Sequence, residues 1–115
     1  MSQLFAGATG VAFDADRNLA FVTSEYSKSF VVVDLAGSHG VPLQVVGVVR
    51  HEQLSGEAIQ YDSRQQRAFV ISRKASALLV VDVANRLEPN VVGVLSSMKR
   101  ALERGDSQHA AVSHL

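Results

Sequence analysis

The chain of 115 residues has no cysteine and no tryptophan, and its eleven Lys and Arg balance its eleven Asp and Glu. Without cysteine it can form neither a disulfide nor a Cys-ligated zinc site. A formal net charge of zero gives no long-range attraction to nucleic acid or to anionic lipid, so we expect neither as a partner. No apolar run approaches the roughly 20 residues of a membrane helix, which favours a soluble protein.

Further absences narrow the range of functions. Residues 1–10 lack the basic stretch and following apolar stretch of a secretion signal, so we expect no signal peptide and favour the cytoplasm. The glycine-rich nucleotide motifs and the HExxH zinc motif are missing, and we expect no cofactor. The chain has seven aromatic residues in all, so the aromatic surface on which a lectin stacks sugars is not evident.

The sequence contains an internal repeat. Residues 11–35 align with residues 59–83 at a constant offset of 48, with eight of 25 positions identical. The identical pairs are Asp14/Asp62, Ala20/Ala68, Phe21/Phe69, Val22/Val70, Ser24/Ser72, Val32/Val80, Val33/Val81 and Asp34/Asp82. Small length changes in the loops then bring Pro42 to Pro89 and residues 45–48 to residues 91–94. Two copies of one supersecondary unit therefore make up most of the chain.

Each unit consists of four short runs rich in valine and aromatic residues, separated by polar turn residues. This pattern is typical of consecutive antiparallel strands, and runs of about six residues dominated by valine make helices a poor alternative. We expect strands at residues 9–14, 19–24, 30–35, 43–49, 58–62, 68–72, 78–83 and 90–95. The recurring aspartates, Asp14, Asp34, Asp62 and Asp82, end strands, where we expect them to accept turn N–H groups rather than bind cations.

The third strand of each unit, at residues 30–35 and 78–83, does not alternate apolar with polar residues. We therefore expect both of its faces to be buried, which stacked sheets provide and a single sheet does not. Repeated four-stranded sheets of 40 to 50 residues that pack on one another are the blades of a β-propeller. The sequence predicts an all-β fold of two four-stranded antiparallel blades, at about 9–49 and 58–95, within one domain.

The two units resemble the LVIVD repeat of β-propeller proteins. The segments FVVVD at residues 30–34 and LLVVD at residues 78–82 occupy the place of the name-giving motif, and a proline and a V-G-V segment follow each. The segment FVTS at residues 21–24 is also similar to the YVTN-type repeat. The resemblance spans about residues 9–96. It implies a propeller blade and leaves function open, because such propellers are binding platforms, surface proteins and occasionally enzymes.

Two blades are fewer than the roughly four to eight of a closed propeller. Two stacked sheets also leave two apolar outer faces, which is more apolar surface than soluble monomers normally expose. We expect these faces to pair between copies in a ring, as a homotrimer of six blades in preference to a tetramer of eight. The alternative that remains open is a fragment of a longer propeller protein.

The C-terminal tail, residues 96–115, continues beyond the repeat. Ser97, the spacing of Met98, Ala101 and Leu102, and Gly105 predict one or two turns of helix. Residues 108–115 form either a ninth strand, which could lie in a neighbouring copy, or a frayed end.

No catalytic constellation is visible within one chain. His109 and His114 are five residues apart, a spacing that does not let them easily share one metal ion, and no metal is expected. The candidate residues are those of loops that would border a central channel: His51, Glu52, Glu57, Asp106 and His109. The leading interpretation is an oligomeric scaffold or binding module of unknown ligand. The alternative is an enzyme, metal-dependent or not, whose site forms where symmetry gathers these residues at the ring axis.

Overall fold

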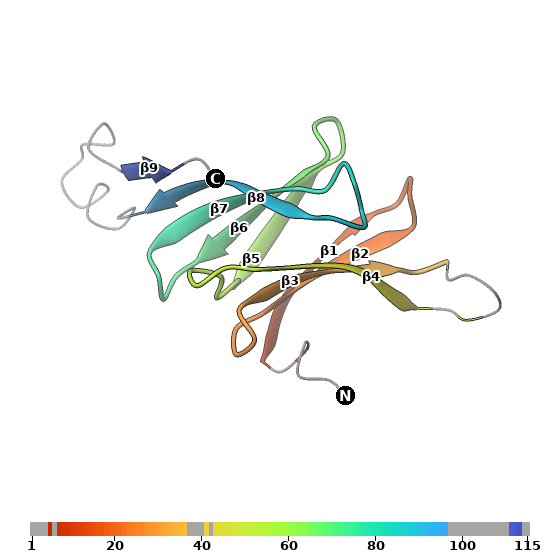
Figure 1. Ribbon diagram of the computed structural model, residues 1–115, viewed down its shortest axis with the longest axis horizontal. Helices are drawn as coiled ribbons and strands as arrows, with labels where there is room; N and C mark the ends of the chain where they lie inside the picture. Colours follow the sequence, from red (N-terminus) through yellow and green to blue (C-terminus); the bar gives the residue numbers. More distant parts are fainter. Residues whose placement is uncertain (1–4, 6, 37–40, 42, 97–110, 114–115) are drawn as a thin grey trace.

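The computed structural model describes residues 5, 7–36, 41, 43–96 and 111–113. Within this part the fold is all-β, with two antiparallel sheets that we call sheet one and sheet two (Figure 1). Sheet one contains β1 (Ala8–Asp14), β2 (Leu19–Ser24), β3 (Ser29–Asp34) and β4 (Gln44–Arg50) in that order. Sheet two contains β5 (Ala58–Asp62), β6 (Arg67–Ser72), β7 (Ala77–Asp82), β8 (Asn90–Ser96) and β9 (Ala111–Ser113).

The eight strands of the repeat begin and end within one residue of their predicted positions. The predicted arrangement of two antiparallel four-stranded units is confirmed. Among the described residues no helix is long and apolar enough to cross a membrane.

The turns repeat along with the strands. Asp14 accepts the N–H groups of Asp16 and Arg17, and Asp62 accepts those of Arg64 and Gln65 in the equivalent turn. Asp34 and Asp82 likewise accept the N–H groups of Ala36 and Ala84. The prediction that the recurring aspartates bind turn N–H groups is confirmed. Each carboxylate fixes the bend that sends the next strand back along its sheet.

The core lies between the two sheets. On the side of sheet one it contains Phe21 and Phe30, whose ring centroids are 5.6 Å apart, and Phe21 also contacts Tyr61 of β5 at 4.9 Å. The fully buried apolar side chains of this core are Leu19, Phe21, Phe30 and Val32 from sheet one, Leu54 from the connection, and Ala68, Val70, Ala77, Leu79, Val81 and Val83 from sheet two. One face of each sheet is thus sealed against the other.

The sheets pack head to tail, which means that the core face of sheet two is the repeat equivalent of the outer face of sheet one. Phe21 and Val32 point into the core from sheet one, but their repeat equivalents Phe69 and Val80 lie outside the buried core of sheet two. In sheet two the core is filled by Val70 and its neighbours, whose sheet-one equivalents, such as Val22, lie on the outer face. One face of sheet two therefore covers sheet one. The other face of sheet two corresponds to the covered face of sheet one, and it is not packed against sheet one.

The third strands of the two units differ in burial. Strand β3 is buried along nearly its whole length, as predicted, but β7 alternates between buried and half-buried residues. Leu79 and Val81 are fully buried, whereas Leu78, Val80 and Asp82 are not. The continuous apolar run of β7 reflects two apolar faces, of which one is buried in the core and the other is half-buried among the described residues.

The tail partly follows its prediction. A ninth strand is present, but β9 pairs antiparallel with β8 of its own sheet, Leu95 opposite Val112, rather than with a neighbouring copy. Sheet two consequently has five strands instead of the predicted four. The helix predicted from Ser97 to Gly105 lies outside the described residues.

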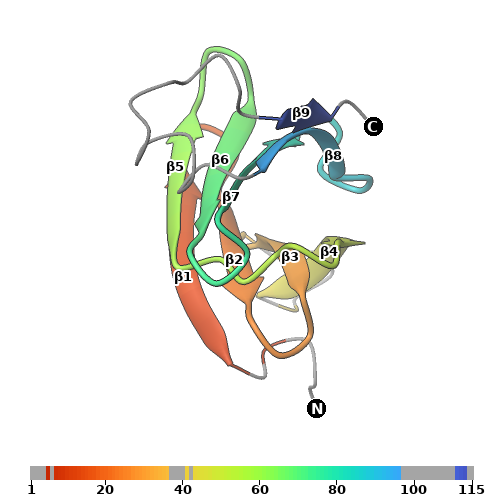
Figure 2. The same ribbon diagram turned by 90° about the vertical axis from the view of Figure 1, so that its left-hand side faces the viewer.

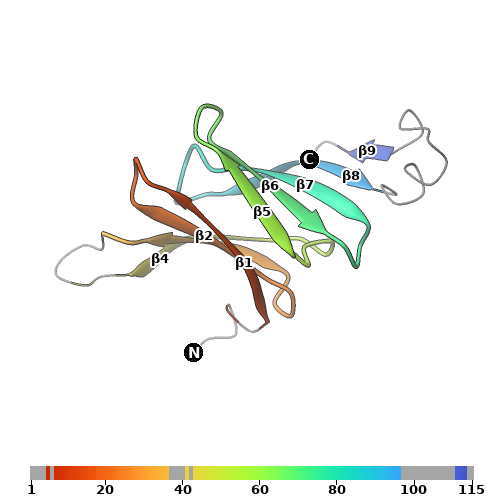
Figure 3. The same cartoon turned by 180° about the vertical axis from the view of Figure 1, so that it is seen from behind.

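The two sheets form a wedge. They are closest at β1 and β5, which contact each other, and they splay apart toward β4 and β8 (Figure 2). From behind, β1 and β5 lie side by side where the sheets meet (Figure 3). The first strand of each unit therefore lies at the narrow edge and the fourth at the wide edge.

The head-to-tail packing predicts opposite outcomes for Val32→Asp and Val80→Asp, two changes at equivalent positions. A carboxylate at Val32 lies unpaired in the core and should cost about 3 kcal/mol or more, enough to unfold a small domain. The same group at Val80 remains in contact with water and should cost about 1 kcal/mol. Thermal unfolding of dilute protein, followed by circular dichroism, measures both. Equal loss of stability in the two variants would contradict this packing.

Candidate functional site

The connection between the sheets, residues 51–57, carries three of the predicted candidates. The His51 N–H donates to the Lys28 carbonyl at 3.1 Å, and the His51 Nδ1 accepts the Gln53 N–H at 3.1 Å. Leu54 follows and is 1% exposed, which anchors the connection in the core. The half-buried imidazole of His51 is thus engaged in the turn that leads the chain from one sheet to the next.

The end of this connection is held by hydroxyl groups from both sheets. The Ser72 Oγ accepts the N–H groups of Ser55 and Gly56 at 3.0 and 3.2 Å, and the Thr23 hydroxyl donates to the Gly56 carbonyl at 2.8 Å. Gly56 has a φ of +55°, and any Cβ there would collide with the Thr23 side chain. A glycine is therefore required at the point where the connection enters β5.

The predicted candidates that the structure describes have separate surroundings within the chain. Glu52 is exposed, and Glu57 pairs with Arg73 across 3.6 Å. Asp106 and His109 lie outside the described residues. Within the described part of the chain, no three His, Cys, Asp or Glu side chains are close enough to share a metal ion.

We call the contact between the two sheets the joint. A polar cluster lies at the end of the joint opposite residues 51–57, and the sequence did not predict it. The Arg17 guanidinium donates to the Asp14 carboxylate at 2.7 Å, to the Tyr61 hydroxyl at 3.1 Å and to the carbonyls of Val83 and Ala84. The Tyr61 hydroxyl donates to the same Asp14 carboxylate at 2.7 Å. One arginine thereby ties a turn of sheet one to two segments of sheet two.

The charges in this cluster stabilise one another. Burial alone would raise the pKa of Asp14, but hydrogen bonds from Arg17 and Tyr61 outweigh burial and hold that pKa below its usual value. Burial and the bond to Asp14 together raise the pKa of the Tyr61 hydroxyl. The cluster is therefore an ionised carboxylate held by a guanidinium and a neutral phenol, which suits it to joining two sheets.

Two further ion pairs cross the joint. Asp34 of β3 pairs with Arg86 of the β7–β8 loop at 3.1 Å, and Glu25 of the β2–β3 turn pairs with Lys74 of the β6–β7 turn. Polar contacts thus hold the two sheets together at both ends of the apolar core.

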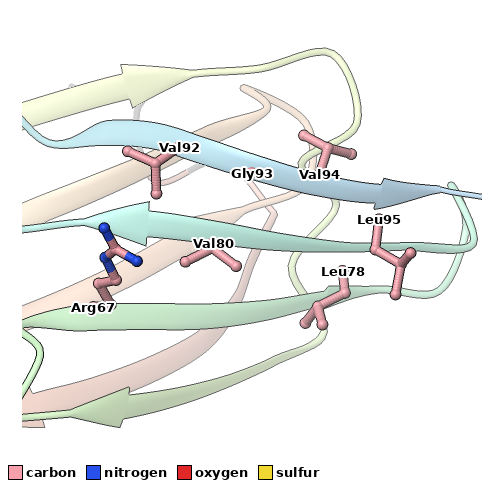
Figure 4. Close-up of a pocket in the computed structure, with 7 residues that line it drawn as sticks. All are labelled: Arg67, Leu78, Val80, Val92, Gly93, Val94 and Leu95. Carbon is pink, nitrogen blue, oxygen red and sulfur yellow. The ribbon is translucent and has the colours of Figure 1, made fainter. Parts of the chain in front are cut away.

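An apolar groove of about 280 Å³ lies on the outer face of sheet two (Figure 4). Its walls are Leu78 and Val80 of β7 and Val92 and Leu95 of β8, and Arg67 lies at one end, 3.5 Å from Asp82. This groove is the part of sheet two that corresponds to the covered face of sheet one.

Two equivalent glycines show how differently the two faces are covered. A Cβ on Gly47 in β4 would collide with the Arg86 carbonyl and approach Pro89 Cδ to 2.7 Å, because the β7–β8 loop rests on it. Among the described residues, a Cβ on Gly93 in β8 would meet the Val80 side chain, at 3.9 Å, and nothing nearer. Gly47 leaves space for the β7–β8 loop. At Gly93 no described residue fills the equivalent space.

The chain matches no protein-family model and no curated protein.

The lowered pKa of Asp14 predicts how stability depends on pH. Its stabilisation is present above the unfolded-state pKa of about 3.9 and is lost as the pH falls through the lower folded-state pKa. Asp14→Asn should lower the free energy of unfolding by about 1–3 kcal/mol at pH 7, and this difference from the native chain should shrink below about pH 3.

Urea unfolding between pH 7 and pH 2.5 measures this difference. Asp62→Asn is the matched control, because Asp62 accepts the equivalent turn N–H groups, and no guanidinium bond to it is present among the described residues. Its substitution should have a much smaller effect. A difference for Asp14→Asn that stays constant with pH would show that the charge is not what stabilises the joint.

Proposed function

We propose that the chain is the two-sheet unit of a propeller-type ring, in which three copies place six sheets around an axis, and that the ring is a non-enzymatic scaffold that binds a partner at its axial loops. One observation carries this proposal. The head-to-tail packing leaves open, on sheet two, the counterpart of the face that sheet one uses to hold sheet two.

The character of the outer faces supports self-association. On sheet one, Val11, Phe13 and Val45 are 54%, 60% and 42% exposed, on the face that corresponds to the packed face of sheet two. On sheet two, the apolar groove lies on the opposite outer face. Exposed apolar side chains at two edges of a sheet, and an apolar groove on its neighbour, are surface that can serve as an interaction site in a soluble protein. The two faces differ from each other, so they suit a joint between unlike faces of identical chains.

The wedge supports closure into a ring. A joint between unlike faces repeats from copy to copy, and it gives a ring if the rotation closes and a filament if it does not. Sheets that converge at β1 and β5 and splay at β4 and β8 rotate about an axis beside the first strands (Figure 2). Six sheets fall within the usual range of propellers, and three copies supply them.

The connection at residues 51–57 supports a binding role. It lies next to β5, the strand at the narrow edge of the wedge, and its backbone is anchored by Leu54 and Ser72. Loops held on a rigid scaffold are common positions for binding residues. In a ring, the exposed Glu52 and the half-buried His51 and Glu57 would recur in each copy around the axis.

Mass in solution tests the proposal. Light scattering of the purified chain should give a single species of three chain masses that persists over a range of concentrations. A compact monomer at all concentrations would contradict self-association. A mass that grows steadily with concentration would contradict closure, since filaments lengthen by the same joint.

A further inference from the structure

Leu43 is an exposed leucine with a strained backbone. Its side chain is 64% exposed, and its φ of +59° lies in the left-handed region, which a leucine adopts only at a conformational cost. We infer that Leu43 is an anchor for association, and that its side chain enters the apolar groove on the outer face of sheet two of a second copy. This inference rests on the proposed function and names the side chain that fills the groove.

Leu43 is an addition to the repeat. In the second unit a proline directly precedes Asn90, whereas in the first unit Leu43 stands between the proline and Gln44. Gln44 and Asn90 have equivalent places, because each lies opposite the aspartate that ends the third strand of its sheet. The second unit thus forms the same kind of sheet without a leucine at this place, so the fold of a unit does not require Leu43.

Two further exposed apolar residues flank Leu43. Val41 and Val45 are 50% and 42% exposed, and we call these three residues the apolar segment. In the second unit Glu88 has the place of Val41, so this place in the repeat accepts a charged side chain. Aliphatic side chains in water gain free energy of burial when a partner covers them. The apolar segment is therefore suited to a contact that the isolated chain does not make.

The groove of sheet two matches the apolar segment in chemistry. It has an open volume of about 280 Å³, and the walls named above are aliphatic (Figure 4). At its end Arg67 and Asp82 pair with each other. An entering leucine therefore leaves neither charge without its partner, whereas an entering ion would compete with one of them.

The groove and the apolar segment also match in position. The groove lies on β7 and β8, the third and fourth strands of sheet two, and the apolar segment leads into β4, the fourth strand of sheet one. In a ring of head-to-tail sheets, the wide edge of one sheet lies beside the wide edge of the next. The segment of one copy then reaches the groove of its neighbour, and every joint of the ring fills one groove with one leucine.

Leu43→Gly tests the anchor, because it should change folding and association in opposite directions. A glycine adopts a positive φ without strain, so the thermal midpoint of the dilute chain should stay the same or rise, while association should weaken at least tenfold. Ser76→Gly is the matched control. Ser76 has a φ of +50° in the β6–β7 turn, so its replacement relieves similar strain and should leave association unchanged.

Sedimentation over a dilution series measures association, and circular dichroism measures folding. A Leu43→Gly variant that associates as tightly as the native chain would overturn the inference.

A charge exchange tests the contact with the groove. Leu43→Lys should weaken association at least tenfold, because it places an ammonium group in an apolar groove. Adding Val80→Asp in the same chain puts a carboxylate in that groove and should recover most of the loss. Adding Val11→Asp instead supplies the same charge on sheet one and should recover nothing. Equal recovery by both, or by neither, would show that Leu43 does not enter the groove.

The two proposals fail separately in these experiments. A native chain that stays monomeric removes both the ring and this contact. A native chain that forms trimers, with Leu43 variants that assemble equally well, keeps the ring and removes only the anchor argued here.

Discussion

The structure depends on the burial of one sheet face by the next sheet. Neither sheet has a helix over it within the described residues, so sheet one alone would expose Phe21 and Phe30 to water, and sheet two alone would expose Val70 and Leu79. Burying such side chains stabilises each by about 1.5–3 kcal/mol, which makes the joint the main source of stability. Because the faces follow in the same order in both units, closing this joint leaves the apolar groove on the outer face of sheet two unpacked against sheet one.

Polar contacts distinguish the closed joint from the open one. Arg17 reaches Asp14, Tyr61 and two backbone carbonyls, so it recognises one particular turn and loop of sheet two. Such contacts contribute specificity more than raw affinity, since each charged group also loses water. The equivalent Gln65 carries no charge. Charged contacts thereby hold the chain's own two sheets to each other.

The sequence was informative about local structure and less so about contacts between the sheets. Valine runs and turn aspartates determine strands and bends within a few residues, and the repeat duplicates them, so the eight strands were predictable. The burial of β7 was not, because a run such as that of Leu78 to Val83 is equally apolar whether one face or both are covered. The Asp14–Arg17–Tyr61 cluster was missed because Tyr61 is 47 residues from Asp14, and only the stacking of β1 on β5 joins them.

Gly93 is unusual for a residue on the outer face of sheet two. A glycine within a strand costs stability through chain entropy and contributes no side chain to the sheet. Gly47 has a reason within the chain, since the β7–β8 loop occupies the space of its missing side chain. Gly93 has a negative-φ backbone and room for a Cβ beside the described residues, so neither its conformation nor the described packing requires glycine.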